Sequence, residues 1–292
     1  MIYDIHQTTT YEYAAPVPVA KHILRMTPVN RIGLKVLDSW IEITPTPADQ
    51  CSAFDFFGNN IIHVDVDRSH ESFVVNTLSR VEVDSPLPLL AELTPPFEDV
   101  RRMACLSTSL ASDSPVHFLF PSYLLSLSDE IGAYAAQSFP PGQPILAGAL
   151  DLMTRIRHDF AYEPGATDVT TPPETAFALR SGVCQDFAHV MIVGLRSLGL
   201  PAAYVSGYLR TVPPPGKKRL EGADATHAWV SVWCGPEHGW CGLDPTNAIR
   251  ASDDHIVIAI GRDYADVAPS AGIIVSSGEQ KLNVGVDVIP VD

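Results

Sequence analysis

Residues 181–200 read SGVCQDFAHVMIVGLRSLGL, an apolar stretch with a cysteine near its start. Large apolar side chains recur in it at intervals of three or four residues: Phe187, Met191, Leu195 and Leu198. This spacing predicts a helix with one buried face, and Gly182 places Cys184 in its first turn. The positive end of a helix dipole lowers the pKa of a thiol there. Cys184 is therefore either a small buried side chain, the commoner case, or a reactive thiol.

A carboxylate in the same turn opposes this activation. Asp186 follows Cys184 by two residues, and a nearby negative charge disfavours the thiolate. A reactive thiol is usually paired with an imidazole that a carboxylate or amide orients. His189 lies about 140° round the helix from Cys184, so we expect it to pack or to make a surface contact instead. The partner histidine must lie further along the chain.

A predicted strand pair supplies such a partner. HAWVSVW alternates like a strand from His227, which places His227 and Trp229 on one face. Residues 235–238 then form a turn before GWCGLDP. If that turn has four residues, Trp229 lies opposite Asp244, and His227 and Asp244 are diagonal neighbours about 7–8 Å apart at the backbone. An odd turn would send Asp244 to the opposite face, so the prediction of a Cys184, His227 and Asp244 site requires an even turn.

Length, composition and charge limit the class of protein. The chain has 292 residues, 46% of them hydrophobic, which indicates two packed domains rather than a disordered or fibrous protein. Its formal charge of -15 would repel nucleic acid and anionic lipid, so neither is an expected partner.

The start of the chain and its cysteines bear on location. MIYDIHQTTTYEY alternates like a strand and lacks the basic start and apolar run of a secretory signal, and no later apolar run approaches a membrane span. The five cysteines are scattered, unlike a dense disulfide framework. We therefore expect a cytoplasmic protein with reduced thiols.

Changes in periodicity divide the chain into three parts. Residues 1–85 are short alternating runs separated by turn residues, including a hairpin signal at Gly58, and predict an antiparallel β-sandwich domain. Residues 86–122 lose this alternation and are interpreted as a connector wrapped on the surface. Residues 123–292 carry helical spacing first and strands afterwards, so the predicted fold class is α+β, with helices packed on an antiparallel sheet.

The run GVCQDFAHVMIVGLRSLGLPAAYVSGYL, followed by THAWVSVW and GLDPTN, resembles the core of the transglutaminase-like superfamily. YEYAAPVPVAKHILRMTP resembles the β domain that precedes this core in bacterial members, and GRDYADVAP resembles their C-terminal segment. The resemblance implies a papain-like fold without metal or cofactor, like that of a bacterial transglutaminase-like cysteine protease. It makes Cys184 the nucleophile, His227 the general base and acid, and Asp244 the group that orients His227. Many relatives have an arginine where this chain has Ala203, so specificity can differ here.

Four further positions complete the expected site. Tyr162, in DFAYEPGAT, and Trp229 are the side chains expected to contact substrate. Asn247 is interpreted as a turn residue rather than a contact in the site. The segment 262–264 either rims a cleft or is a solvated loop with a structural salt bridge.

A zinc site at Cys234, His238 and Cys241 is the rival interpretation of the strand pair. It lacks a fourth ligand and a C-x-x-C pair, and both cysteines should point away from His227, so we expect no metal there.

The expected activity is hydrolysis of a peptide or protein amide through an acyl thioester. The alternatives are transfer of a glutamine acyl group to an amine and, in a different class, a non-catalytic binding module of the same fold. The sequence makes no prediction of oligomeric state.

Overall fold

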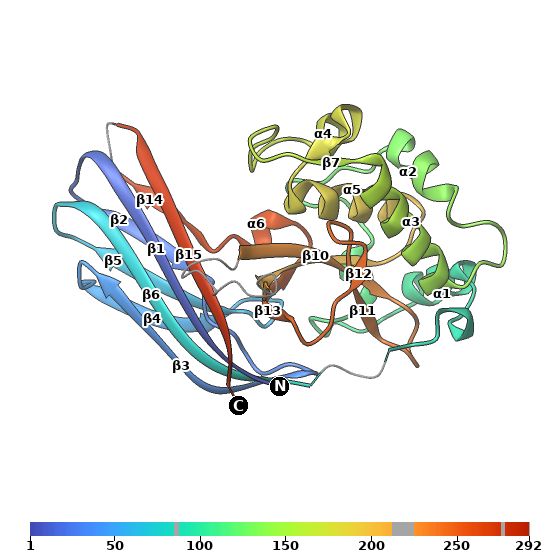
Figure 1. The fold of residues 1–292 in the computed structure, drawn as a ribbon, viewed down its shortest axis with the longest axis horizontal. Helices are drawn as coiled ribbons and strands as arrows, with labels where there is room; N and C mark the ends of the chain where they lie inside the picture. Colours follow the sequence, from blue (N-terminus) through green and yellow to red (C-terminus); the bar gives the residue numbers. More distant parts are fainter. Residues whose placement is uncertain (85–87, 212–224, 276–277, 292) are drawn as a thin grey trace, which may run out of the picture.

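The computed structural model describes residues 1–84, 88–211, 225–275 and 278–291. A β-sandwich lies beside a core of helices packed on an antiparallel sheet (Figure 1). This architecture confirms the predicted α+β class. Within the described residues no helix is both long enough and apolar enough to cross a membrane.

Two four-stranded antiparallel sheets form the sandwich, in the orders β15-β1-β6-β3 and β14-β2-β5-β4. Their N-terminal strands are β1 (Ile2–Val17), β2 (Ala20–Leu24), β3 (Leu34–Thr44), β4 (Asp49–Phe54), β5 (Asn60–Val66) and β6 (His70–Val83). Alternate residues are buried between the sheets, as in β6, where Phe73 and Val75 are inaccessible to solvent. The predicted hairpin is confirmed, since β4 pairs with β5 and Gly58 adopts a positive φ of 72° in the turn.

The last two strands correct the predicted domain range of 123–292. β14 (Ser270–Ile274) pairs with β2, and β15 (Gln280–Val291) pairs with β1 along its length, from Ile2 opposite Val291 onward. Both strands therefore belong to the sandwich rather than to the core, and the two ends of the chain lie together (Figure 1). Alternation in sequence predicts a strand but carries no information about which sheet the strand joins.

The predicted connector also differs from expectation, because part of it packs into the core. It contains η1 (Ala91–Leu93), α1 (Phe97–Cys105) and η2 (Pro115–Phe118). Val100 and Ala104 on α1 are fully buried in the main apolar cluster of the core. The prolines and serines that interrupt the periodicity of the connector lie outside α1, which is short and amphipathic.

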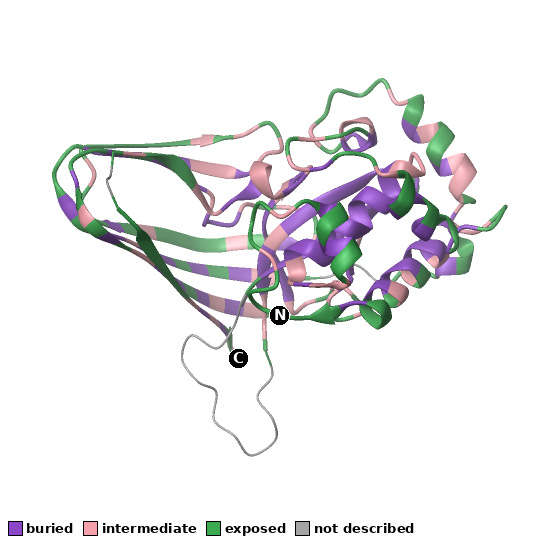
Figure 2. Ribbon diagram, turned by 90° about the horizontal axis from the view of Figure 1, so that it is seen from above, coloured by how far each residue is buried: buried purple, intermediate pink, exposed green. Residues whose placement is uncertain are grey.

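The core surrounds α5 (Cys184–Ser197), the helix predicted from the 181–200 stretch. Its residues from Gln185 to Arg196 are all buried, against the sheet on one side and neighbouring helices on the other (Figure 2). The other helices are α2 (Asp129–Ala136), α3 (Ile145–Asp159), α4 (Pro173–Leu179) and the short α6 (Tyr264–Val267).

The core sheet has the order β12-β11-β10-β9-β13. Its strands are β9 (Ala202–Leu209), β10 (Ala225–Trp233), β11 (Trp240–Asp244), β12 (Ile249–Arg250) and β13 (His255–Gly261). A separate two-residue parallel pair, β7 (Ala161–Tyr162) with β8 (Ser181–Gly182), leads directly into α5.

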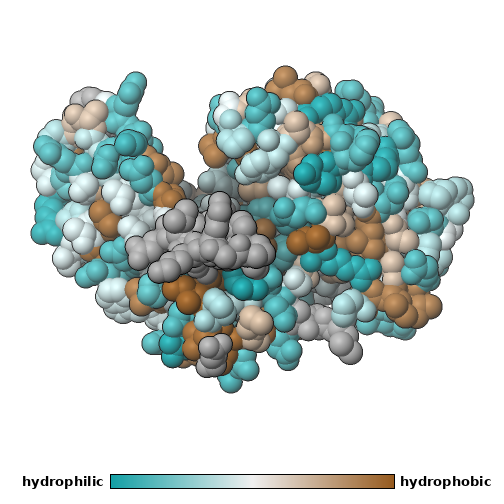
Figure 3. Space-filling view, viewed as in Figure 1, coloured by the Kyte–Doolittle hydropathy of each residue, from teal (hydrophilic) through white to brown (hydrophobic). Residues whose placement is uncertain are grey.

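Sandwich and core are joined by an apolar cluster and by buried hydrogen bonds. The cluster combines side chains of the sandwich with three of the core sheet, Tyr208, Ile256 and Ile258. The buried Asn59 amide extends β13 as another strand would: its Nδ2 donates to the Ile260 carbonyl, and its Oδ1 accepts the Ile260 N–H, each at 2.8 Å. The surface is nevertheless hollowed between the two parts on the face seen in Figure 3.

Replacing Asn59 with Ala should lower the free energy of unfolding by about 2–4 kcal/mol, because the part-buried N–H and carbonyl of Ile260 lose their partner. Urea denaturation measures this loss. The control is Asn76→Ala, which removes one exposed hydrogen bond to Thr8 within the sandwich and should change stability far less. Equal losses in the two variants would contradict a joining role for Asn59.

Candidate active site

The β10–β11 turn has the even length that the site requires. Trp233 lies opposite Trp240 and Val230 opposite Leu243, and the Cys234 N–H donates to the Gly239 carbonyl at 2.8 Å. Residues 235–238 are thus a four-residue turn, and the predicted register is confirmed. Continuing that register by one step sets Trp229 opposite Asp244, with His227 on the same face.

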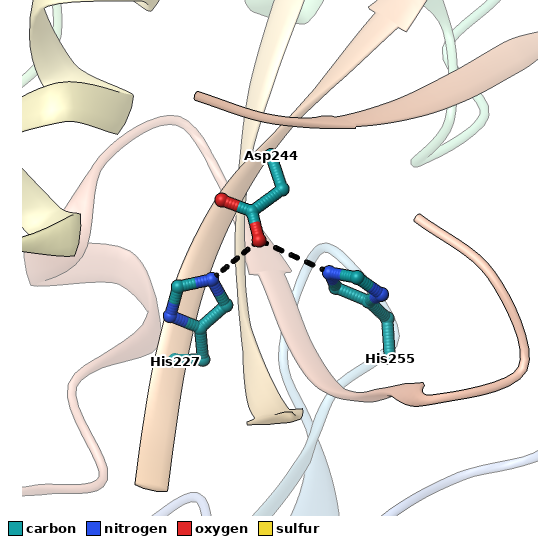
Figure 4. Close-up of side chains that lie close together, drawn as sticks. All are labelled: His227, Asp244 and His255. Atoms are coloured by element: carbon teal, nitrogen blue, oxygen red, sulfur yellow. Dashed lines mark hydrogen bonds and ion pairs between the residues drawn. The ribbon is translucent and has the colours of Figure 1, made fainter. Parts of the chain in front are cut away.

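His227 and Asp244 meet through their side chains. His227 Nε2 donates to Asp244 Oδ2 at 2.8 Å, and the other ring nitrogen, Nδ1, points away from the carboxylate (Figure 4). Asp244 is 0% exposed and His227 is 8% exposed. The two side chains therefore form an ion pair or a charge-assisted hydrogen bond that is almost wholly shielded from water.

Further donors surround the Asp244 carboxylate. Oδ2 also accepts from His255 Nε2 at 3.2 Å and from the Asn247 side-chain amide at 2.7 Å. Oδ1 accepts the backbone N–H groups of Thr246 at 2.9 Å and Asn247 at 3.2 Å. Burial by itself raises the pKa of Asp244, but the hydrogen bonds from His227 and His255 outweigh burial and hold it well below its usual range.

Asn247 and His255 are the two residues that sequence reasoning underestimated. Asn247 does close a turn, as interpreted, yet its amide also holds the carboxylate. His255 drew no attention because it merely opens an apolar run, HIVIAI. No spacing rule connects the start of β13 to the end of β11, so only the folded sheet reveals the contact.

The His227 imidazole has a second partner besides Asp244, the thiol of Cys184. Burial works to lower this pKa, but hydrogen bonds with Asp244 and with the Cys184 thiol outweigh burial and raise it from 6.5 to about 9. The thiol and the carboxylate thus flank one imidazole. The structure brings together the three side chains that the sequence predicted.

Cys184 is the first residue of α5 and is half-buried. The Asp186 carboxylate, expected to disfavour a thiolate, is occupied: its Oδ2 accepts from the Val183 N–H at 2.8 Å and from the Thr167 hydroxyl at 2.6 Å. A Cβ at Gly182 would lie 2.5 Å from the same oxygen, so glycine is required for this close approach. Asp186 therefore stabilises the start of the helix that carries the sulfur.

The two side chains expected to contact substrate differ in accessibility. Tyr162 is 52% exposed, and its pKa is raised by partial burial and by the charge of Cys184; it pairs with Gly182, two residues before the cysteine, and so lies near the start of α5. Trp229 is only 2% exposed and packs against the rings of His227 and His255, with centroids 6.2 Å and 5.2 Å away. The expectation that Trp229 contacts substrate is corrected, since its indole packs the two imidazoles in place.

Other singled-out residues have structural contacts. His189 is buried, accepts the Tyr264 N–H at 3.3 Å, and has its pKa lowered to about 4 by burial, which fits the expected packing role. Asp263 caps α6, and Arg262 forms an ion pair with Asp266 at 2.8 Å, as in the salt-bridge interpretation of this segment.

An arginine does brace the strand that contains Ala203, but it comes from α5. The buried Arg196 guanidinium donates to the Ala202 carbonyl from both Nε and Nη2, at 3.1 and 2.8 Å. It also donates to the backbone carbonyls of Phe120 and Arg262. The arginine missing at position 203 is therefore not needed to hold the start of β9.

Among the described residues, His227, Asp244 and His255 are close enough to share a metal ion, with their ligand atoms within 4.8 Å of one another. Both imidazoles instead meet one carboxylate oxygen at hydrogen-bond distance, and the Asn247 amide occupies the same oxygen. We therefore assign a hydrogen-bonded network to this group.

Comparison with known proteins agrees with this geometry. Residues 3–82 match the family described as bacterial transglutaminase-like N-terminal region, and residues 133–245 match the transglutaminase-like superfamily. The chain belongs to the transglutaminase-like superfamily. The resemblance inferred from Cys184, His227 and Asp244 and their surrounding motifs is thus confirmed at the level of family.

Relatives cover the whole chain or only its core. An uncharacterized protein of Mycobacterium tuberculosis is 39% identical over 99% of this chain and 92% of its own length. A protein-glutamine gamma-glutamyltransferase of Pseudomonas aeruginosa is 37% identical over 125 residues, 41% of this chain and 18% of that protein. The crystal structure of a proposed cysteine protease from Cytophaga hutchinsonii shares the fold, with a TM-score of 0.75, 23% identity, and coverage of 100% of this chain and 92% of that one.

The free energy of unfolding should be highest near neutral pH. The pKa values of His22 and His189 are lowered to about 4 by burial, so the stability they contribute is complete above their unfolded pKa of 6.5 and is lost as the pH falls toward 4. His227 has the opposite sign: its contribution is complete below 6.5 and is lost as the pH rises through about 9.

Urea denaturation at about pH 5, 7 and 9.5 should show a loss of about 3 kcal/mol on the acid side, where two histidines contribute, and about 2 kcal/mol on the alkaline side. His189→Gln should lessen the acid loss without removing it, because His22 remains, and His227→Gln should flatten the alkaline side. A stability that does not vary over this range would contradict both assignments.

Proposed function

We propose that the chain is a cysteine-dependent amide hydrolase with Cys184 as nucleophile, His227 as general base and acid, and Asp244 as the group that orients His227. The observation that carries this proposal is the His227 imidazole held between a thiol at a helix start and a buried carboxylate. An imidazole in that position takes the thiol proton on Nδ1 while its Nε2–H stays bonded to Asp244.

In the proposed mechanism the Cys184 sulfur attacks the amide carbonyl, forming an S–C bond and a tetrahedral oxyanion. Because Cys184 is the first residue of α5, its N–H has no carbonyl partner within the helix. This N–H is therefore the natural donor to the oxyanion. His227 then protonates the leaving amine as the C–N bond breaks. Water activated by His227 cleaves the resulting thioester and regenerates the thiol. Tyr162, half-exposed and paired with Gly182 near the start of α5, is the proposed wall of the acyl pocket.

Cys184→Ala should abolish turnover of a peptide amide without altering the fold, because one sulfur is removed at a helix end. Asp244→Asn should lower kcat by about 100-fold or more, since the amide favours the wrong imidazole tautomer. Peptidase assays and circular dichroism measure the two effects.

The matched control is Cys241→Ala, which removes another half-buried thiol of the core and should retain activity. Alkylation of Cys184 by iodoacetamide at a rate no higher than that of Cys241 would count against any catalytic role and favour a binding module.

A second candidate is acyl transfer to an amine, favoured by the similarity to the Pseudomonas aeruginosa protein-glutamine gamma-glutamyltransferase. A glutamine-containing peptide incubated with and without a labelled primary amine separates the two reactions. We expect ammonia to be released at the same rate with and without the amine, because water accepts the acyl group in both samples. Amine incorporation that displaces hydrolysis would reject the hydrolase in favour of the transferase.

We also propose a cytoplasmic location, supported by five cysteines that are all unpaired thiols. Fractionation of cells that produce the full protein tests it, and recovery from the envelope fraction would overturn it.

A further inference from the structure

His255 is buried beside Asp244 and makes specific hydrogen bonds, which a residue that only fills space does not require. Its side chain is 1% exposed, and both ring nitrogens have partners. Nδ1 accepts the Ser252 N–H at 3.3 Å, so the ring proton lies on Nε2, which donates to Asp244 Oδ2 at 3.2 Å. Two histidines thus donate to one carboxylate oxygen (Figure 4).

A second donor on that oxygen constrains the orientation of the carboxylate. The terminal torsion of an aspartate has a broad energy minimum, and the other partners of the Asp244 carboxylate come from His227 and the adjacent turn. His255 comes from the far edge of the core sheet, beyond β10 and β9, and so supplies an anchor independent of that turn. Trp229 packs against both imidazoles, whose own centroids are 6.1 Å apart.

The sandwich fixes His255 in turn. Its neighbour Ile256 and the next alternate residue, Ile258, are buried in the apolar cluster that joins sandwich and core. The preceding residue, Asp254, accepts the Tyr3 hydroxyl at 3.0 Å and the Arg210 Nε–H at 2.6 Å. Contacts from β1 and from Arg210, the residue after β9, therefore determine where the imidazole lies.

We infer that His255 is a positioning residue, which holds the Asp244 carboxylate in the orientation that keeps His227 directed at Cys184, and that the sandwich supports the site through β13. This inference rests on the proposed function for its effect on turnover, but not for its effect on His227. Removing a hydrogen-bond partner that orients a catalytic group changes activity by about 10- to 100-fold, as is found for the outer-shell partners of metal-bound histidines.

Three variants distinguish the hydrogen bond that His255 donates to Asp244 from the packing of its side chain. His255→Leu fills the space without a donor, and His255→Gln restores an N–H near the place of Nε2. His189→Gln is the matched control, because it removes a second buried core histidine that has no contact with Asp244. We expect kcat about 10- to 100-fold lower in His255→Leu with KM nearly unchanged, substantial recovery in His255→Gln, and wild-type kcat in His189→Gln.

The titration of His227, followed by nuclear magnetic resonance, needs no substrate. The pKa of His227 should fall in His255→Leu and return toward the wild-type value in His255→Gln, since only the former removes a donor that helps to orient the carboxylate. An unchanged His227 titration in His255→Leu, or equal losses of kcat in Leu and Gln variants that both fold, would overturn the inference. Failure of the proposed function is distinct: it would appear as a wild-type protein without turnover and an unreactive Cys184.

Discussion

The buried carboxylate of Asp244 is the constraint on which the rest of the core depends. An ionised carboxylate removed from water costs several kcal/mol unless it is fully hydrogen-bonded. Its five donors come from β10, from the turn after β11, and from the start of β13. The strand register, the turn and the position of β13 must all be correct together, so one charge specifies three separate parts of the fold.

The sequence predicts the local half of this network. A four-residue turn between two alternating strands is enough to put His227 and Asp244 on one face, and the helix start that carries Cys184 follows from apolar spacing and a glycine. The partners that sequence reasoning missed lie across the sheet. His255 reaches Asp244 only because the strand order places β13 beyond β9, and periodicity contains no strand order. Trp229 shares the face of His227 as predicted, but its burial depends on Gly207 in β9, where a Cβ would lie 2.6 Å from the indole.

Domain organisation was predictable to a similar extent. The alternation of residues 1–85 identifies the sandwich, and the same alternation near residues 270–291 identifies two more strands. Their membership in the sandwich, however, depends on pairings with β1 and β2 more than 200 residues earlier in the chain. Such pairings are decided by complementary apolar faces in three dimensions, which single-strand patterns do not contain. The connector shows the opposite case, where prolines obscure a helix that the core buries.

The pairing of β1 with β15 has a consequence for the order of events during synthesis. Domains generally fold as units, the earlier ones first. Here the strand that completes the first sheet is made after the entire core, so the sandwich cannot close until residues 280–291 have emerged. Because the sandwich supports the start of β13, the hydrogen-bonded network around Asp244 gains its last support only then. A nascent chain therefore carries Cys184 in an unfinished setting until residues 280–291 have been made and have paired with β1.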